Sequence, residues 1–113
     1  MRGAGIINPG DLKFTPVNTA AFTVVAGVAG WVDTDVSATT GVNPRRVWLI
    51  VAQTNAQAIG AREHGRTETP SVTLWSDDSC TLMAMVDAAG HIDFYRNAVV
   101  TNTYVFLGYL ELL

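Results

Sequence analysis

The sequence is poor in charge and in cysteine, and each shortage excludes a class of protein. Charged residues make up 15% of the 113 residues and hydrophobic residues 49%, whereas disordered chains are rich in charge and poor in apolar residues. The formal net charge is −3, while nucleic-acid-binding domains normally carry a basic face, so no nucleic-acid partner is expected. Cys80 is the single cysteine, which excludes the small secreted domains that are held together by internal disulfides.

Long hydrophobic runs and known catalytic motifs are also missing. The longest apolar stretch, residues 20–32, is interrupted by Thr23 and two glycines and is shorter than the roughly 20 residues that a membrane-spanning helix needs. Residues 33–35 (DTD) begin like a calcium-binding loop, but Ala38 stands where that loop requires glycine. The nucleophile-elbow, zinc-protease and phosphate-binding glycine motifs do not occur. We therefore expect a protein that is not an enzyme, binds no metal or cofactor and does not enter a membrane.

What the sequence does contain favours β-structure. Valine, isoleucine and threonine are abundant, and their branched side chains suit the pleated, half-buried surface of a strand. Turn residues separate short apolar segments at spacings of about 8–12 residues, which is typical of an antiparallel β-sandwich. The expected strands are residues 12–17, 21–26, 31–37, 46–53, 57–63, 71–75, 80–87, 91–96 and 103–112.

Glycine and proline mark the turns and the N-terminal region. Residues 87–90 (DAAG) have the composition of a hairpin turn, with Gly90 where the backbone takes a positive φ angle. Residues 1–11 combine glycines and a proline with apolar residues, a mixture that interrupts regular structure. We expect residues 1–20 to form an irregular arm with a candidate first strand, and residues 21–113 to form the sandwich domain.

Three of the expected strands, residues 46–53, 80–87 and 103–112, are apolar on both faces. A strand with one solvated face normally alternates apolar and polar residues, and the sequence predicts no helix that could cover a second apolar face. We therefore expect a homo-oligomer that buries this face between copies of the chain. The residues expected on it are Trp48, Ile50, Met83, Met85, Val105, Leu107 and Tyr109.

A few polar residues could bind a metal or take part in acid/base chemistry. His91 and Asp93 share one face of a strand, and Asp87 lies across the adjoining turn. They could be half of a metal site or an acid/base pair, but a solvated polar face explains them equally well, and we favour that interpretation. Arg62 shares a strand face with small residues, so its partly buried guanidinium is expected to pair with Asp87, Asp93 or a neighbouring subunit.

An alternative function involves Trp75. This residue precedes a polar loop, residues 76–79 (SDDS), and an aromatic ring beside hydrogen-bonding groups is typical of carbohydrate-binding surfaces. In this alternative, Trp75, Asp77 and Asp78 form the glycan site of a receptor-binding spike or fibre protein.

Four segments resemble landmarks of the small jelly-roll-type virion proteins of tailed bacteriophages. They are residues 31–37 (WVDTDVS), 59–65 (IGAREHG), 86–92 (VDAAGHI) and 106–109 (FLGY), and the resemblance covers about residues 31–110. Proteins of this kind decorate or cement capsids, or form spikes and fibre heads, commonly as trimers.

The resemblance implies a jelly-roll-like sandwich with a structural, non-enzymatic role, in which Gly60 and Arg62 are landmarks of the fold. It implies a homotrimer that is made in the host cytoplasm and stabilises the phage head as a capsid decoration or cement protein. Its partner there would be the major capsid protein or another virion protein. Residues 1–20 lie outside the resemblance, and terminal extensions of such proteins often dock onto the shell, so Ile6 and Ile7 are expected to dock there.

Overall fold

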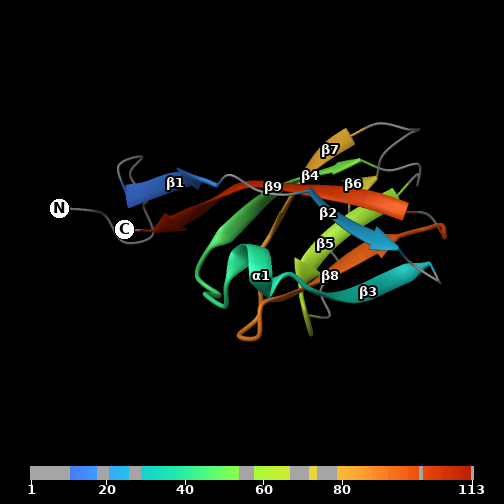
Figure 1. The fold of residues 1–113 in the computed structure, drawn as a ribbon, viewed down its shortest axis with the longest axis horizontal. Helices are drawn as coiled ribbons and strands as arrows, with labels where there is room; N and C mark the ends of the chain where they lie inside the picture. Colours follow the sequence, from blue (N-terminus) through green and yellow to red (C-terminus); the bar gives the residue numbers. More distant parts are fainter. Residues whose placement is uncertain are drawn as a thin grey trace.

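The protein is an all-β sandwich, as the sequence predicts. The computed structural model describes residues 11–17, 21–25, 29–53, 58–66, 72–73, 79–99 and 101–112. Two antiparallel sheets pack against each other (Figure 1). The described elements are β1 (Leu12–Pro16), β2 (Ala21–Val25), β3 (Gly30–Asp35), α1 (Ser37–Thr40), β4 (Val47–Gln53), β5 (Ala58–Glu63), β6 (Val72–Thr73), β7 (Ser79–Ala84), β8 (His91–Arg96) and β9 (Thr101–Leu112).

The order of the strands is that of a jelly roll. Sheet A has the order β1-β9-β4-β7, with β2 also paired to β9, and sheet B has the order β3-β8-β5-β6. β1 pairs with residues 108–112 of β9 and β2 with residues 101–105, so β1 and β2 are two halves of one edge strand. The chain then crosses between the sheets at every connection except the one from β5 to β6. This double Greek-key path is the jelly-roll arrangement.

The core lies between the two sheets and is built from large apolar side chains. The rings of Phe94 on β8 and Tyr104 on β9 stack across it, with centroids 4.0 Å apart and planes inclined by 22°. Burial of each such side chain stabilises the fold by about 1.5–3 kcal/mol relative to leaving it in water. The buried hydrophobic residues are Val36, Trp48, Ile50, Ala52, Ile59, Ala61, Leu82, Ala84, Val86, Ile92, Phe94, Tyr104 and Phe106.

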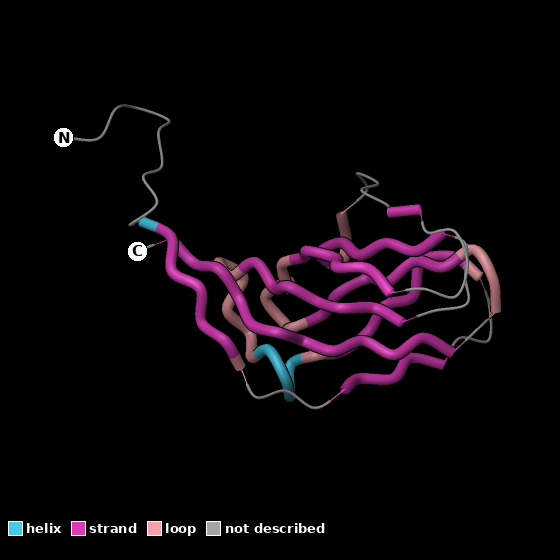
Figure 2. The backbone as a smooth tube through the Cα atoms, turned by 90° about the horizontal axis from the view of Figure 1, so that it is seen from above, coloured by secondary structure: helices cyan, strands magenta, loops and turns pink. Residues whose placement is uncertain are grey.

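Sheet A is longer than sheet B. β1 and the C-terminal end of β9 extend beyond the other strands (Figure 2). Lys13 lies opposite Glu111 in this extension, and Arg46 Nε lies 3.5 Å from Glu111 Oε2, with the guanidinium 4.1 Å from the centroid of the Tyr109 ring. The inner side of the extension is therefore charged where the other sheet no longer covers it.

The single helical turn α1 was not predicted from the sequence. Residues 31–37 are expected as one strand, but β3 ends at Asp35, whose Oδ1 accepts hydrogen bonds from the backbone N–H of Ser37 at 2.9 Å and from its hydroxyl at 2.7 Å. A carboxylate that binds a backbone N–H two residues ahead stabilises a turn in place of an extended strand. The described part of the chain contains no helix long and apolar enough to cross a membrane.

Candidate functional site

The polar residues that could bind a metal or act as acids and bases lie together on the outer face of sheet B. Strand pairing places Asp33, Asp93 and Arg62 directly opposite one another on β3, β8 and β5, and Asp35 lies opposite His91. Residues two positions apart share one face of a strand, so these side chains all point away from the core. We call the following five residues the His–Asp cluster: Asp33, Asp35, His64, His91 and Asp93.

Short contacts link both imidazoles of the cluster to one carboxylate oxygen. His64 Nδ1 lies 2.6 Å from Asp93 Oδ1 and 3.4 Å from Asp33 Oδ1. His91 Nδ1 lies 2.7 Å from the same Asp33 oxygen, and the two imidazole rings are 5.7 Å apart. Side chains of β3, of β8 and of the turn after β5 therefore converge on one point of the surface.

Arg62 holds the buried member of the cluster in place. Its Nε donates a hydrogen bond of 3.1 Å to Asp93 Oδ2, and its guanidinium lies 4.0 Å from the centroid of the Trp31 ring. The Trp31 ring in turn contacts Tyr95 at a centroid distance of 5.2 Å. Asp93 is only 5% exposed, so this pairing compensates a carboxylate that would otherwise be costly to bury. The expectation that Arg62 pairs with a carboxylate is confirmed, and the carboxylate is that of Asp93.

The sequence identified only part of this cluster. His91 and Asp93 share the outer face as expected, but His91 contacts Asp33 rather than Asp93. The side chain of Asp87 has a different role, because its Oδ1 accepts the backbone N–H groups of Ala89 and His91 at 2.9 Å and so stabilises the turn. His64 and Asp33 enter the site only through the pairing of β3 and β5 with β8, and the local sequence contains no signal for that register.

The contacts shift the pKa values of the cluster in opposite directions. The hydrogen bond to Asp93 raises the pKa of His64 above its usual 6.5, and the hydrogen bond to Asp33 raises the pKa of His91 in the same way. Burial is the largest influence on Asp93 and opposes its ionisation, but the hydrogen bonds from His64 and Arg62 together leave its pKa below the usual 3.8. The cluster is therefore most stable as charged carboxylates beside protonated imidazoles.

Replacement of Asp93 by alanine is expected to lower the free energy of unfolding by about 2 kcal/mol, because it leaves the partly buried Arg62 without its carboxylate. The lowered pKa means that the contribution of Asp93 is present above pH 3.8 and disappears as the pH falls through the folded-state pKa. The contributions of the imidazoles are complete below pH 6.5 and disappear as the pH rises through their raised folded-state pKa values. Urea denaturation between pH 3 and 8, with EDTA present, measures the free energy of unfolding in both pH ranges.

In the same series, the free energy of unfolding of Asp93→Ala should depend less on pH than that of the wild type. The variant lacks the loss of stability that protonation of Asp93 causes at acidic pH, and it lacks the loss that deprotonation of His64 causes at alkaline pH. Asp33→Ala is the control, since it leaves the Asp93–Arg62–His64 contacts in place. It should therefore lose stability at acidic pH as the wild type does. A profile of Asp93→Ala that runs parallel to that of the wild type would contradict this assignment.

The outer face of sheet A is apolar and forms the second surface of interest. Lys13 and Glu111 are the charged residues of β1, β4, β7 and β9, and both lie on the inner side, in register with each other and out of phase with Phe14 and Leu110. The outer side of these four strands therefore carries no charged side chain. We call the following residues the apolar outer face: Leu12, Phe14, Leu49, Val51, Met83, Met85, Val105, Leu107, Leu110 and Leu112.

The structure places only some of the residues predicted for self-association on this face. Met83, Met85 and Leu107 are exposed, and Val105 is half-buried. These four side chains lie on the apolar outer face as expected.

The predicted outward positions of Trp48, Ile50 and Tyr109 are wrong. Trp48 and Ile50 are 1% and 0% exposed and belong to the core, while Tyr109 packs inward against Trp48 at a ring distance of 4.9 Å. The physical reason for Tyr109 is a β-bulge: Ile50 pairs with Phe106 but Leu49 pairs with Gly108, so one extra residue of β9 inverts the alternation beyond it.

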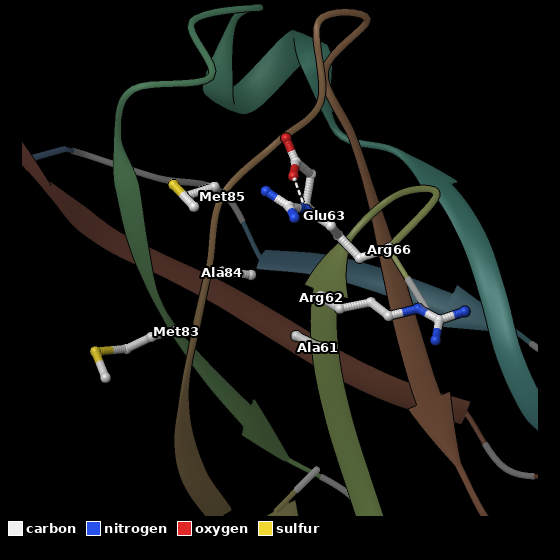
Figure 3. Close-up of a pocket in the computed structure, with 7 residues that line it drawn as sticks. All are labelled: Ala61, Arg62, Glu63, Arg66, Met83, Ala84 and Met85. Carbon is white, nitrogen blue, oxygen red and sulfur yellow. Dashed lines mark hydrogen bonds and ion pairs between the residues drawn. The ribbon is translucent and has the colours of Figure 1, made fainter. Parts of the chain in front are cut away.

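A shallow hollow lies where β5 of sheet B approaches β7 of sheet A (Figure 3). It has a volume of about 250 Å³. Glu63 Oε2 pairs with Arg66 Nε at 2.7 Å on its rim, and the guanidinium of Arg62 points away from Met83 and Met85 (Figure 3). The hollow therefore borders the apolar outer face, and its lining residue Arg62 also contacts Asp93 of the His–Asp cluster. Its lining residues are Ala61, Arg62, Glu63, Arg66, Met83, Ala84 and Met85.

Two sets of predicted site residues lie outside the described residues. They are the docking residues Ile6 and Ile7, and the residues of the alternative glycan site, Trp75, Asp77 and Asp78.

Comparison with protein-family models, with curated proteins and with solved structures gave no match. The function is therefore argued from the two outer faces of the sandwich.

Proposed function

We propose that this chain is a structural subunit of a bacteriophage virion, a capsid decoration or cement protein that self-associates as a homotrimer. The observation that carries the proposal is the apolar outer face of sheet A, which has exposed large hydrophobic residues and no charge. In this proposal the chain is made in the host cytoplasm, acts at the capsid surface and has no catalytic role.

The exposed members of the apolar outer face are too apolar and too close together for an ordinary solvated surface. Met83 is 63% exposed, Leu112 56%, and Leu12 and Phe14 44% each. Strand pairing places Leu49 beside Met83 and Phe14 beside Leu110, so these side chains lie on one continuous sheet surface. Contiguous exposed apolar surface on a soluble protein marks an interaction site.

The occupant that best fits this face is another copy of the same chain. A surface without charge offers nothing to an acidic or a basic partner, but it is complementary to itself. In a homotrimer each copy turns this face toward the threefold axis, where it contacts the other two copies. The association stabilises the assembly by about 25 cal/mol per Å² of apolar area buried, less the cost of ordering the partners.

Attachment to the capsid is assigned to the N-terminal segment. The resemblance of residues 31–110 to small phage virion proteins leaves residues 1–20 outside it, and residues 12–16 of these form β1 of sheet A. Docking is therefore assigned to the residues before β1, with Ile6 and Ile7 as apolar contacts for the major capsid protein or another virion protein. β1, which follows these residues in the chain, lies at the projecting end of sheet A (Figure 1).

Light scattering after size exclusion tests self-association. The purified chain at micromolar concentration should have three times its mass of 12.1 kDa, and Met83→Asp should convert it to a folded monomer, because the introduced carboxylate would be buried without a partner in the interface.

Val99→Asp provides the matched control. Val99 is 62% exposed, almost as much as Met83, but it lies in the connection between β8 and β9, away from the apolar outer face, so this variant should keep the wild-type mass. A monomeric wild-type chain, or a Met83→Asp variant that assembles like the wild type, would refute the interface. Copy number in purified phage particles, measured by mass spectrometry, tests the virion role separately.

A further inference from the structure

We propose that Asp33, His64, His91 and Asp93 form a binding site for a zinc ion on the outer face of sheet B, on the opposite side of the sandwich from the apolar outer face. This inference does not depend on the proposed self-association or on a role in a virion. It follows from the positions of the four side chains, from the metals that their donor atoms prefer, and from the neighbouring groups that orient them.

Three of the four ligand atoms already lie at nearly the spacing that a metal requires. One ligand atom each from Asp33, His64 and Asp93 lie within 4.8 Å of one another. A tetrahedral zinc ion with bonds of about 2.0–2.2 Å separates its ligand atoms by about 3.3–3.6 Å. The distance from His64 Nδ1 to Asp33 Oδ1 is 3.4 Å, and the distances from His64 to Asp93 and from His91 to Asp33 are 2.6 and 2.7 Å. Opening the contact between His64 and Asp93 by about 1 Å or less makes room for the ion among the first three ligands, and His91, which lies outside that group but already contacts Asp33, turns toward the ion as the fourth.

The chemistry of the donors favours zinc over calcium or magnesium. Two of the four donors are imidazole nitrogens, and imidazole suits zinc and related transition metals, whereas calcium and magnesium prefer sites made of oxygen alone. Two histidines and two aspartates supply the four ligands of a tetrahedral zinc site.

Neighbouring groups orient the proposed ligands by hydrogen bonds and ion pairs, as the residues around the ligands do in known metal sites. Arg62 binds Asp93 Oδ2, which leaves Oδ1 directed to His64. His91 Nε2 faces Asp35 Oδ2 at 3.8 Å, and Asp35 is itself held by the backbone and hydroxyl of Ser37. A histidine that binds a metal through one nitrogen commonly donates its other N–H to a carboxylate, and Asp35 would take that role for His91 once this contact shortens to hydrogen-bond distance.

The charge of the site also matches a divalent cation. With both imidazoles neutral, as metal binding requires, Asp33, Asp35 and Asp93 carry three negative charges and Arg62 carries one positive charge. These four groups sum to −2, which one zinc ion offsets, and Asp87 adds further negative charge near both imidazoles. Bound zinc would join β3, β8 and the turn after β5 at one point of the surface, so its role is to stabilise the outer face of sheet B.

Calorimetric titration of the full-length, untagged, EDTA-treated chain with zinc chloride at pH 7.5 tests the site. We expect one zinc ion per chain, with micromolar or tighter affinity, and a rise in the thermal unfolding temperature when zinc is added. In NMR spectra of the wild-type chain, zinc should shift the ring signals of both histidines together. Cobalt in place of zinc should show the visible absorption of tetrahedral coordination.

His64→Gln and His91→Gln should each weaken zinc binding at least tenfold, because each removes a ligand. Glu63→Gln is the matched control: Glu63 adjoins His64 but pairs with Arg66, so zinc affinity should not change. Circular dichroism checks that the variants are folded. Failure of the wild type to bind zinc at 100-fold excess over chain, or unchanged affinity in both histidine variants, would overturn the proposal; if either variant fails to fold, the wild-type NMR titration decides alone.

Discussion

Replacement of Trp48 by alanine is expected to lower the free energy of unfolding by about 3–5 kcal/mol, the usual cost of removing a large aromatic residue from a core. Trp48 is 1% exposed, and its indole contacts the rings of Phe106 at 5.8 Å and Tyr109 at 4.9 Å. Since small domains have a total stability of about 5–15 kcal/mol, this loss should remove a substantial part of the stability of the fold. Urea denaturation followed by far-UV circular dichroism measures the change.

Two comparison variants separate core packing from other effects. Trp48→Phe should cost clearly less than Trp48→Ala, because it keeps a ring in the core and removes an indole N–H that has no hydrogen-bond acceptor among the described residues. Val99→Ala, at a residue that is 62% exposed, should change stability by no more than about 0.5 kcal/mol. If Trp48→Ala left stability intact and abolished self-association instead, Trp48 would belong to the subunit interface, as the strand pattern alone suggests.

Replacement of Gly90 by alanine is expected to lower the free energy of unfolding by about 2–5 kcal/mol, from two causes that act together. The backbone of Gly90 has φ +81°, and an L-residue in the left-handed region costs about 1–2 kcal/mol. In addition, an added Cβ would lie 2.6 Å from the Cβ of Ser37 and 2.9 Å from the carbonyl oxygen of Gly41, so α1 would have to move away from the turn, at about 1–3 kcal/mol for overpacking.

Gly65→Ala is a control that isolates the second cause. Gly65 has nearly the same backbone angle, φ +88°, but an added Cβ there meets nothing within 4 Å. It should cost only the conformational part, about 1–2 kcal/mol. Equal losses in the two variants, measured by thermal or urea denaturation, would show that α1 does not pack on Gly90 as described.

The two outer faces give the sandwich two independent roles in these proposals. The apolar outer face of sheet A is assigned to contact between copies of the chain, and the His–Asp cluster of sheet B is assigned to an ion. The two surfaces lie on different sheets, so Met83→Asp should leave zinc binding unchanged and His64→Gln should leave the oligomeric mass unchanged. The failure of one proposal therefore does not affect the other.

Local sequence was sufficient for the strands and for most of the turn chemistry. β-Branched residues and regular turn spacing predicted the sandwich, and the expected strands agree with those of the structure to within a few residues. The glycine of residues 87–90 was predicted at a positive φ angle and Gly90 has one. The turn α1 was missed because its cause is a single hydrogen-bonding side chain, that of Asp35, at the end of a segment with a good strand pattern.

The sequence by itself determined that the chain is all-β, that a surplus of apolar strand faces exists, and that Arg62 needs a carboxylate partner. Only the tertiary structure decided which faces are buried. Alternation along one strand separates two faces but does not say which of them meets the other sheet, and the bulge at Leu107 inverts the pattern within β9. Likewise, Asp33, His64 and Asp93 converge because β3 and β5 pair with β8 in one register, and hydrogen bonds between distant strands set that register.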